Sequence, residues 1–151
     1  MSTTTKDRIL KVRSALHRCI FSWTNGRVLG RWGGLPVVML TTTGRRSGRP
    51  RTTMLASPVQ EGDRIVLVAS NGGAARHPDW YLNLRDRPEA GVAMRGRRER
   101  MRARTASAEE KDRLWPMVTN RSPSYARYQE RTTRDIPIVL LEPADAGPAN
   151  T

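Results

Sequence analysis

Four arginines stand close together in the stretch LTTTGRRSGRPR, residues 40–51, which also holds two glycines and a proline. Guanidinium groups bind phosphate and carboxylate oxygens through paired hydrogen bonds. Because the stretch follows an apolar, β-branched run, we expect it to form a loop at the rim of a sheet. Three interpretations remain open for it: a solvated hairpin, a nucleic-acid contact, or a cradle for a small anionic ligand. The arginines are Arg45, Arg46, Arg49 and Arg51.

This loop is not a P-loop. Gly44 and Gly48 are too closely spaced, no lysine follows them, and Pro50 leads into a second strand-like run instead of a helix. An anion here would be held by arginine side chains and by backbone N–H groups exposed at the turn.

A second candidate site is ASNGGAARHPDW, residues 69–80, where an apolar strand runs into Asn71, Gly72 and Gly73 and a helix begins near Pro78. Glycines let the backbone approach a ligand closely, and a helix N-terminus carries partial positive charge. The three-glycine spacing of a dinucleotide fingerprint is missing. A flexible strand-to-helix loop without a ligand is the alternative interpretation.

A third candidate is SPSYARYQERTTRDIP, in which Tyr125 and Tyr128 share one face of a predicted helix. Their hydroxyls could donate protons or hydrogen bonds to a substrate, whereas half-buried packing is the commoner role of such pairs. Cys19 has only His17 near it and no acidic partner, so it is not expected to act as a nucleophile. With one cysteine and two histidines in the whole chain, we expect no metal site.

The elements that must position these residues are mostly strands. Alternating or continuous apolar patterns predict strands, and Gly96 is placed at a hairpin turn. In the run 98–106, arginines occupy one parity and Met101 and Ala103 the other, which predicts one solvated and one buried face. Ser107 and Glu110 have the spacing of a helix capping box. The strands are predicted at 37–43, 51–59, 63–70, 91–96, 98–106 and 136–143, and the helices at 77–88 and 107–119.

The fold class that this order favours is α+β, mainly β: about six antiparallel strands forming a barrel, with an N-terminal helix and two or three short helices. Apolar residues at helical spacing predict a basic amphipathic helix over residues 6–23, which usually packs on its own domain but can also lie on a membrane surface. We divide the chain into 1–35 (helix and glycine-rich connector), 36–143 (barrel) and 144–151 (disordered tail).

Charge is the strongest global property. The chain has 27 basic and 14 acidic residues among 151, a formal net charge of +13. This favours anionic partners without selecting one. A nucleic-acid role is not favoured, because the arginine-rich segment 95–104 has no interleaved aromatic residues. The sequence has no apolar run of membrane-spanning length and no signal-peptide core, which predicts a cytoplasmic protein.

Together, LTTTGRRSGRPRTTML, VLVASNGGAARHPDWYLNL and YARYQERTTRDIPIVLLEP resemble the deazaflavin-dependent nitroreductase family, actinobacterial enzymes that use coenzyme F420. The resemblance covers residues 37–143. It implies a split β-barrel related to flavin-binding proteins, a dimer in many relatives, and hydride transfer from reduced F420 to a quinone, nitroaromatic or other conjugated acceptor. FMN is the less favoured cofactor. The alternative function is a non-catalytic deazaflavin, flavin or heme carrier of the same fold.

The resemblance also implies site residues. Residues matching the family's catalytic group are Ser70, Tyr125 and Tyr128. Those matching its cofactor site are Gly44, Arg45, Arg46, Ser47, Gly48, Arg51, Ala69, Ser70, Asn71, Gly72, Gly73, Pro78 and Trp80. The acceptor pocket is implied to include Ala56, Ser122 and the two tyrosines.

The chain departs from the family pattern at four of these positions. Asn71 and Arg46 stand where relatives have lysine, and Ala56 and Ser122 stand where they have aromatic residues. We therefore expect the cofactor site to be kept and the acceptor pocket to be more open and less aromatic.

Overall fold

The structure is a computed structural model that describes residues 31–32 and 34–144. The predicted helix over 6–23, its proposed membrane contact, Cys19 and the tail after residue 144 lie outside the described residues. None of the described helices is long and apolar enough to cross a membrane. The strands are β1 (Arg31–Trp32), β2 (Leu35–Thr43), β3 (Pro50–Ala56), β4 (Val59–Glu61), β5 (Arg64–Val68), β6 (Glu89–Met94), β7 (Arg97–Thr105) and β8 (Ile138–Pro143). The helical segments are η1 (Asn71–Gly73), α2 (Asp79–Asp86), α3 (Ala108–Arg121) and α4 (Ser124–Glu130).

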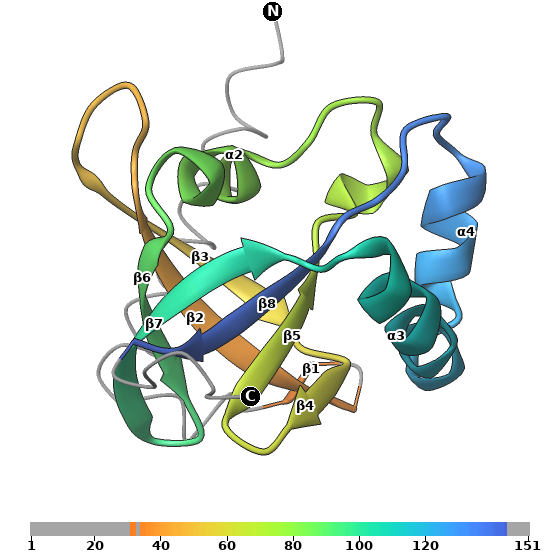
Figure 1. Ribbon diagram of the computed structural model, residues 1–151, viewed down its shortest axis with the longest axis horizontal. Coiled ribbons are helices and arrows are strands. Elements are labelled where there is room, and N and C mark those ends of the chain that lie inside the picture. Colours follow the sequence, from red (N-terminus) through yellow and green to blue (C-terminus); the bar gives the residue numbers. More distant parts are fainter. Residues whose placement is uncertain (1–30, 33, 145–151) are drawn as a thin grey trace, which may run out of the picture.

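The strands form one antiparallel sheet that curls into a split barrel (Figure 1). The hydrogen-bonded order is β1-β2-β6-β7-β8-β5-β4, and β3 pairs with β2. No ladder joins β3 to β4 among the described strands, so strand pairing does not close the barrel. The mainly β, α+β class predicted from the sequence is confirmed, with two short strands, β1 and β4, beyond the six expected.

The predicted strand over 51–59 is interrupted, because the chain changes partner at Ser57 and Pro58. β3 pairs with β2, and β4 pairs with β5. The Ser57 N–H donates to the Pro36 carbonyl (2.9 Å), and its fully buried hydroxyl lies 2.9 Å from the Val66 carbonyl oxygen and 3.1 Å from that of Val59. Ser57 thus links β2 to β5 by hydrogen bonds at the point where β3 and β4 do not pair.

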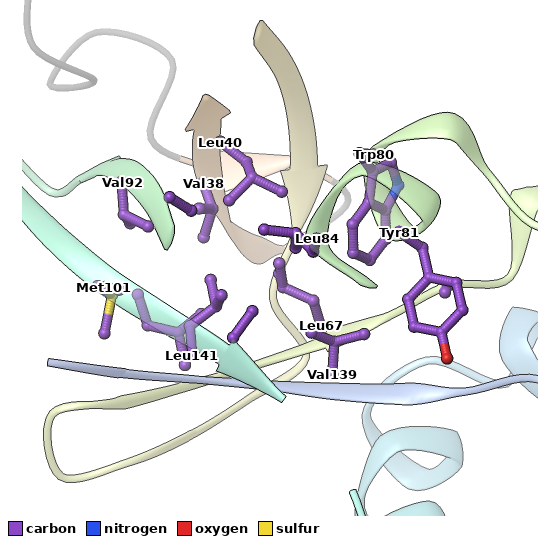
Figure 2. Packing of buried hydrophobic residues seen from close by; sticks show 14 residues of the cluster. Val38, Leu40, Leu67, Trp80, Tyr81, Leu84, Val92, Met101, Val139 and Leu141 are labelled. Atoms are coloured by element: carbon purple, nitrogen blue, oxygen red, sulfur yellow. The ribbon is translucent and has the colours of Figure 1, made fainter. Parts of the chain in front are cut away.

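The barrel interior is filled by one apolar cluster to which most strands contribute alternate residues (Figure 2). Trp80, Tyr81 and Leu84 of α2 complete it at one end. The helix therefore covers an end of the barrel and holds its own position by burying these three side chains. Labelled members of the cluster include Val38, Leu40, Leu67, Val92, Met101, Val139 and Leu141.

A second apolar cluster lies on the outer face of β5 and β8, beneath α3 and α4. Leu114 and Val118 of α3 pack there with Val66 and Leu140. Because β5 and β8 are buried on both faces, their sequences are continuous apolar runs without alternation. The apolar outer faces of β5 and β8 thus explain why α3 and α4 pack over these two strands.

The β6–β7 hairpin has the predicted geometry. Arg95 and Gly96 form its turn with φ values of 50° and 80°, as a two-residue turn of type I′ requires. Met101 and Ala103 are buried, and the arginines of the opposite parity are exposed. The solvated arginine face expected from the alternation is confirmed.

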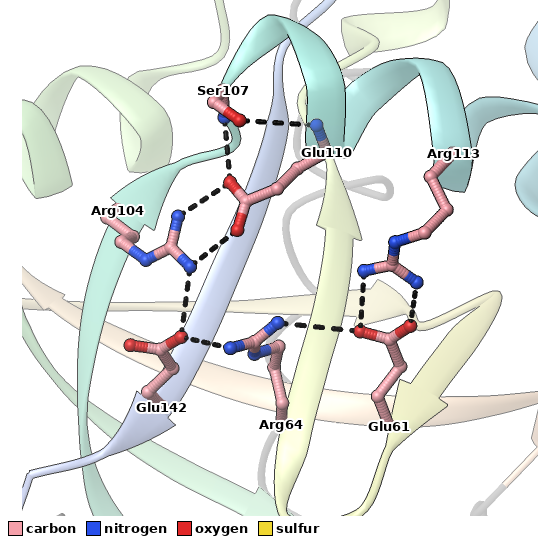
Figure 3. A network of polar contacts seen from close by, with 7 residues as sticks. All are labelled: Glu61, Arg64, Arg104, Ser107, Glu110, Arg113 and Glu142. Carbon is pink, nitrogen blue, oxygen red and sulfur yellow. Dashed lines mark hydrogen bonds and ion pairs between the residues drawn. The ribbon is translucent and has the colours of Figure 1, made fainter. Parts of the chain in front are cut away.

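Ion pairs fasten α3 to the barrel (Figure 3). The predicted capping box is present: the Glu110 N–H donates to the Ser107 hydroxyl, and the Ser107 N–H donates to the Glu110 carboxylate. Both Glu110 oxygens also accept from Arg104 at 2.7 Å, which together with the capping contacts lowers the pKa of Glu110 to about 2. Glu142 and Arg64 extend the network across β8 and β5 to Glu61 and Arg113.

Candidate functional site

The arginine loop joins β2 to β3 and is closed by its own backbone. The Gly44 N–H donates to the Arg49 carbonyl and the Gly48 N–H to the Gly44 carbonyl, both at 2.8 Å. A Cβ on Gly44 would lie 2.6 Å from the Ser47 hydroxyl and 3.3 Å from the Arg49 carbonyl oxygen, so a side chain there would force the Ser47 side chain to move. Gly48 has a φ of +67°. The loop that contains these glycines lies at one end of the barrel, the same end as α2 (Figure 1).

A cavity of about 610 Å³ lies between this loop, the start of β3 and the first turn of α2. It includes five of the residues implied as cofactor ligands in the loop, and Trp80 forms part of its wall. Sequence reasoning missed Thr42, Thr52, Thr53, Arg76, Asp79 and Asn83. The lining residues are Thr42, Gly44, Arg45, Arg46, Ser47, Arg51, Thr52, Thr53, Arg76, Asp79, Trp80 and Asn83.

The charge of the cavity is strongly positive, since four guanidinium groups face one carboxylate, a net +3. Asp79 accepts from Arg76 at 2.8 Å and from Arg45 at 3.3 Å, which holds both arginines against α2. Among the described residues, Arg46 and Arg51 have no ion-pair partner, and both are exposed. Two positive groups are therefore available to an anion that enters the cavity.

Asn83 fixes the loop to the helix and is the clearest residue that the sequence analysis overlooked. It is 4% exposed, and its side-chain oxygen accepts from the Arg45 N–H (3.1 Å) and the Arg45 guanidinium (3.2 Å). Its amide group donates to the Thr42 hydroxyl at 3.1 Å. The only sequence signal is its place one residue before Leu84 and three after Trp80, on the buried face of α2.

The glycine loop follows β5 with three successive positive φ values, 47° at Asn71, 64° at Gly72 and 82° at Gly73. Ala69 and Ser70 precede them and are buried. The Ser70 carbonyl accepts from the Gly73 N–H (2.9 Å), while the Ser70 hydroxyl has no hydrogen-bond partner among the described residues. This hydroxyl is therefore available to a ligand.

The tyrosine helix, α4, packs directly on the glycine loop. A Cβ on Gly73 would lie 2.7 Å from the Tyr128 carbonyl oxygen, so a side chain there would separate the two segments. Tyr125 and Tyr128 share a face, with ring centroids 6.0 Å apart in an edge-to-face arrangement, and both pack on the cluster beneath α3. Burial, with a smaller contribution from Tyr128, raises the pKa of Tyr125 to about 12, so this phenol stays protonated at neutral pH.

The structure places the predicted site residues in two neighbouring groups. The arginine cavity is one, and Ser70 to Gly73 with α4 is the other. They are joined through Arg76, whose carbonyl accepts from the Asn71 side chain (3.0 Å) and whose guanidinium pairs with Asp79. Pro78 lies between the groups, buried at the N-cap of α2.

The two positions that lack a family aromatic residue are placed differently. Ser122 ends α3, and its carbonyl accepts from the Tyr125 N–H at 3.2 Å, so it adjoins the tyrosine helix. Ala56 lies at the end of β3 remote from Pro50 and the arginine loop, about 20 Å along the strand at the usual rise per residue. The structure does not bring Ala56 to the cavity.

Behind the glycine loop, Arg134 and His77 were also missed. Arg134 Nη1 lies 3.0 Å from His77 Nδ1, and the imidazole stacks obliquely on Tyr81 with ring centroids 5.0 Å apart. Burial lowers the pKa of His77, and the charges of Arg134 and Arg85 lower it further. A neutral His77 accepts from Arg134 at Nδ1.

Comparison with known proteins decides the family. The sequence model of the F420H(2)-dependent quinone reductases matches residues 13–143. The chain belongs to this family. An F420H(2)-dependent quinone reductase of Mycobacterium tuberculosis strain H37Rv is 39% identical over 130 residues, covering 83% of this chain and 87% of the relative. The family confirms an oxidoreductase that depends on coenzyme F420, as the sequence resemblance implied.

Solved structures agree with this family. A structure described as an F420-H2 dependent reductase (FDR-A) has a TM-score of 0.65 and 36% identity, covering 71% of this reductase and 94% of that chain. A second, described as a domain-swapped dimer, has a TM-score of 0.66 and 31% identity, covering 89% and 99%. The split-barrel fold of the family is therefore shared by this chain.

The residues present fit the cofactor. F420 carries a phosphate and a glutamate-bearing tail, both anionic, and the arginine cavity has an excess of three positive charges with two arginines unpaired among the described residues. At the glycine turn, Gly72 is exposed, has open space around it and carries no side chain, so a ligand can approach the backbone closely there. The donor set suits an anionic, elongated molecule.

Proposed function

We propose that this reductase oxidises F420H2 with a quinone-like acceptor, and that the arginine cavity binds the acidic tail of the cofactor. The observation that carries the proposal is the pair Arg46 and Arg51, which face a cavity already lined by Arg45 and Arg76. Guanidinium groups that lack an acidic partner gain most from a phosphate or carboxylate, because no internal ion pair must break first. Arg45 and Arg76, held by Asp79, shape the cavity and add to its field.

The second group of residues would face the reacting end of the cofactor. Ser70 lies at the turn between β5 and η1 with its hydroxyl available. Asn71 and Gly72 beside it are exposed, and the open space at Gly72 would let a flat ring approach the backbone. Trp80, anchored in the core, forms part of the wall of the arginine cavity. An elongated cofactor could then lie along the first turn of α2 from one group to the other.

When bound, reduced F420 supplies a hydride to the acceptor, and one further proton completes the conversion of a quinone to a quinol. The protein's part is to hold donor and acceptor in contact distance and to exclude water. Tyr125 and Tyr128 lie on the segment that packs against the glycine turn, where they would border the acceptor. With its pKa raised to about 12, Tyr125 would act as a hydrogen-bond donor to an acceptor oxygen and not as a base.

Binding of the cofactor is the first test. Quenching of F420 fluorescence by the purified protein should give a saturable curve in both redox states, and FMN should bind more weakly because it lacks the glutamate tail. No quenching in either state would refute the proposal. Tight binding without turnover against quinones, nitroaromatics and unsaturated lactones would favour the non-catalytic carrier instead.

We also propose that the reductase forms a homodimer. Support comes from the 31% identical relative described as a domain-swapped dimer, which covers 89% of this chain. Light scattering coupled to size-exclusion chromatography should give twice the 17.0 kDa chain mass. A monomer mass at micromolar concentration would contradict the proposal.

A further inference from the structure

Arg134 occupies an unusual position between α4 and β8, 60 or more residues away in sequence from most of the groups it contacts. Its Nε donates to the Ala74 carbonyl (2.9 Å), Nη1 to the Ala69 carbonyl (3.2 Å) and Nη2 to the Ser70 carbonyl (2.7 Å). Nη1 also meets His77 Nδ1 at 3.0 Å. One planar guanidinium group thus contacts the chain before the glycine turn, after it, and at His77, just before α2 begins.

Arg134 has no carboxylate within ion-pair distance among the described residues. The adjacent Asp135 pairs with Lys111 instead. The Arg134 guanidinium is half-buried and is satisfied by neutral carbonyls and an imidazole. An arginine used in this way contributes geometry through several fixed donors, which a lysine ammonium cannot reproduce.

The segment that Arg134 holds is also shaped by the Asn71 side chain, which donates to the Arg76 carbonyl, and by the packing of Gly73 on α4. Three consecutive residues have positive φ, which costs conformational energy for Asn71. Among the described residues, the backbone hydrogen bonds within the turn are Gly73 N–H to the Ser70 carbonyl and Ala74 N–H to the Asn71 carbonyl. Such a backbone persists only where its surroundings determine it. Arg134 is part of these surroundings, because its guanidinium donates three hydrogen bonds to the Ala69, Ser70 and Ala74 carbonyls that flank the turn.

We propose that Arg134 is a positioning residue for hydride transfer: it fixes the segment from Ala69 to His77 and thereby sets where Ser70 and the glycine turn lie relative to the bound deazaflavin. This inference rests on the proposed function. Arg134 itself touches neither reactant in this account. Its loss shifts the turn, and a displacement of about 1 Å in a reacting geometry can lower a rate on the order of 100-fold.

The test uses Arg134→Lys, which keeps the charge and loses the fork, with Arg127→Lys as the matched control. Arg127 is exposed on α4, and within the described residues its guanidinium donates only to the Ser124 hydroxyl. Stopped-flow oxidation of F420H2 by a soluble naphthoquinone, at saturating cofactor, should be about 10- to 100-fold slower in Arg134→Lys and unchanged in the control. The Kd for F420 should change less than about threefold, because the arginine cavity is intact.

A second readout needs no cofactor. Hydrogen exchange of the ligand-free protein should show faster exchange at the Gly73 and Ala74 amides in Arg134→Lys, with β8 and α2 unchanged. In Arg134→Ala, guanidinium ion at low millimolar concentration should restore part of the rate, and ethylammonium should not. Turnover of Arg134→Lys within twofold of the wild type, or a loss that lies wholly in cofactor Kd, would overturn the inference.

These outcomes separate the inference from the proposed function. A wild-type protein that neither binds F420 nor oxidises F420H2 refutes the proposed function. An active wild type with unchanged exchange at Gly73 and Ala74 in Arg134→Lys refutes the positioning role alone. If Arg134→Ala fails to fold, the turnover and the hydrogen exchange of Arg134→Lys still test the positioning role.

Discussion

Replacing Arg46 and Arg51 by alanine, singly, should weaken F420 binding without weakening the fold. Both side chains line the cavity, and neither has an ion-pair partner among the described residues, so their removal leaves no carboxylate unpaired. Arg49→Ala is the matched control, because Arg49 stands in the same loop, is exposed, and does not line the cavity. All three variants lose one positive charge.

The expected magnitude follows from the exposure of the two side chains. A hydrogen bond to a charged group contributes about 1.5–3 kcal/mol, and solvent exposure of the pair lowers this contribution. We therefore expect about 1–2 kcal/mol for each arginine, which corresponds to roughly a 5- to 30-fold rise in the Kd for F420. The control should change Kd less than about twofold, because it alters only the long-range field.

The assay is a fluorescence-quenching titration with F420 at 20 mM and at 500 mM added salt. The effect of Arg46→Ala and Arg51→Ala should shrink at the higher salt, because ions already screen the pairing there. Equal weakening at both salt concentrations would argue against direct ionic contacts. An Arg49→Ala variant as weak as the other two would show that net charge, and not the cavity, binds the tail.

Three further predictions concern stability. Gly73→Ala should lower the free energy of unfolding by about 1–3 kcal/mol, measured by urea denaturation, because its φ is +82° and the new Cβ meets α4; Gly72→Ala, with open space around it, should cost only about 1 kcal/mol. The pKa of His77 is lowered by burial and by Arg134, so the unfolded state takes up the proton first as pH falls. The contribution of His77 to the free energy of unfolding should then be fully present well above pH 6.5 and decline below it. His77→Gln should remove this part of the decline and leave the part that Glu110 causes at lower pH. Ser57→Ala should destabilise by about 1–3 kcal/mol, because the buried Val59 and Val66 carbonyls lose the one hydroxyl proton that they share; a change below 0.3 kcal/mol would refute the role of Ser57 between β3 and β4.

Features set by neighbouring residues could be predicted from the sequence. The hairpin at Gly96 needs a turn residue with positive φ, and the cap of α3 needs Ser107 and Glu110 three apart; both signals lie within a few residues. The alternation in β7 likewise marks its buried and solvated faces. The arginine loop is likewise predictable, because its signals, the apolar strand before it and Pro50 within it, are close in sequence.

Features set by distant partners could not be predicted. Nothing beside Asn83 marks Thr42 as its partner, 41 residues away, and nothing beside Arg134 marks the Ala69 carbonyl, 65 residues away. The break between β3 and β4 has the same origin, because a partner change at Ser57 depends on where β5 lies. Backbone carbonyls are acceptors at every residue, so sequence carries no signal for those that Arg134 selects.

The most direct test of the reductase is anaerobic mixing of the protein and F420H2 with a menaquinone analogue, a nitroaromatic and an unsaturated lactone, compared side by side. We predict protein-dependent oxidation of F420H2 by the quinone, with one quinol formed for each F420H2 consumed, and slower or no reaction with the other two. Oxidation of F420H2 by the nitroaromatic or by the lactone alone, and not by the quinone, would contradict a quinone acceptor. Absence of oxidation with all three, in a protein that binds F420, would contradict the central claim.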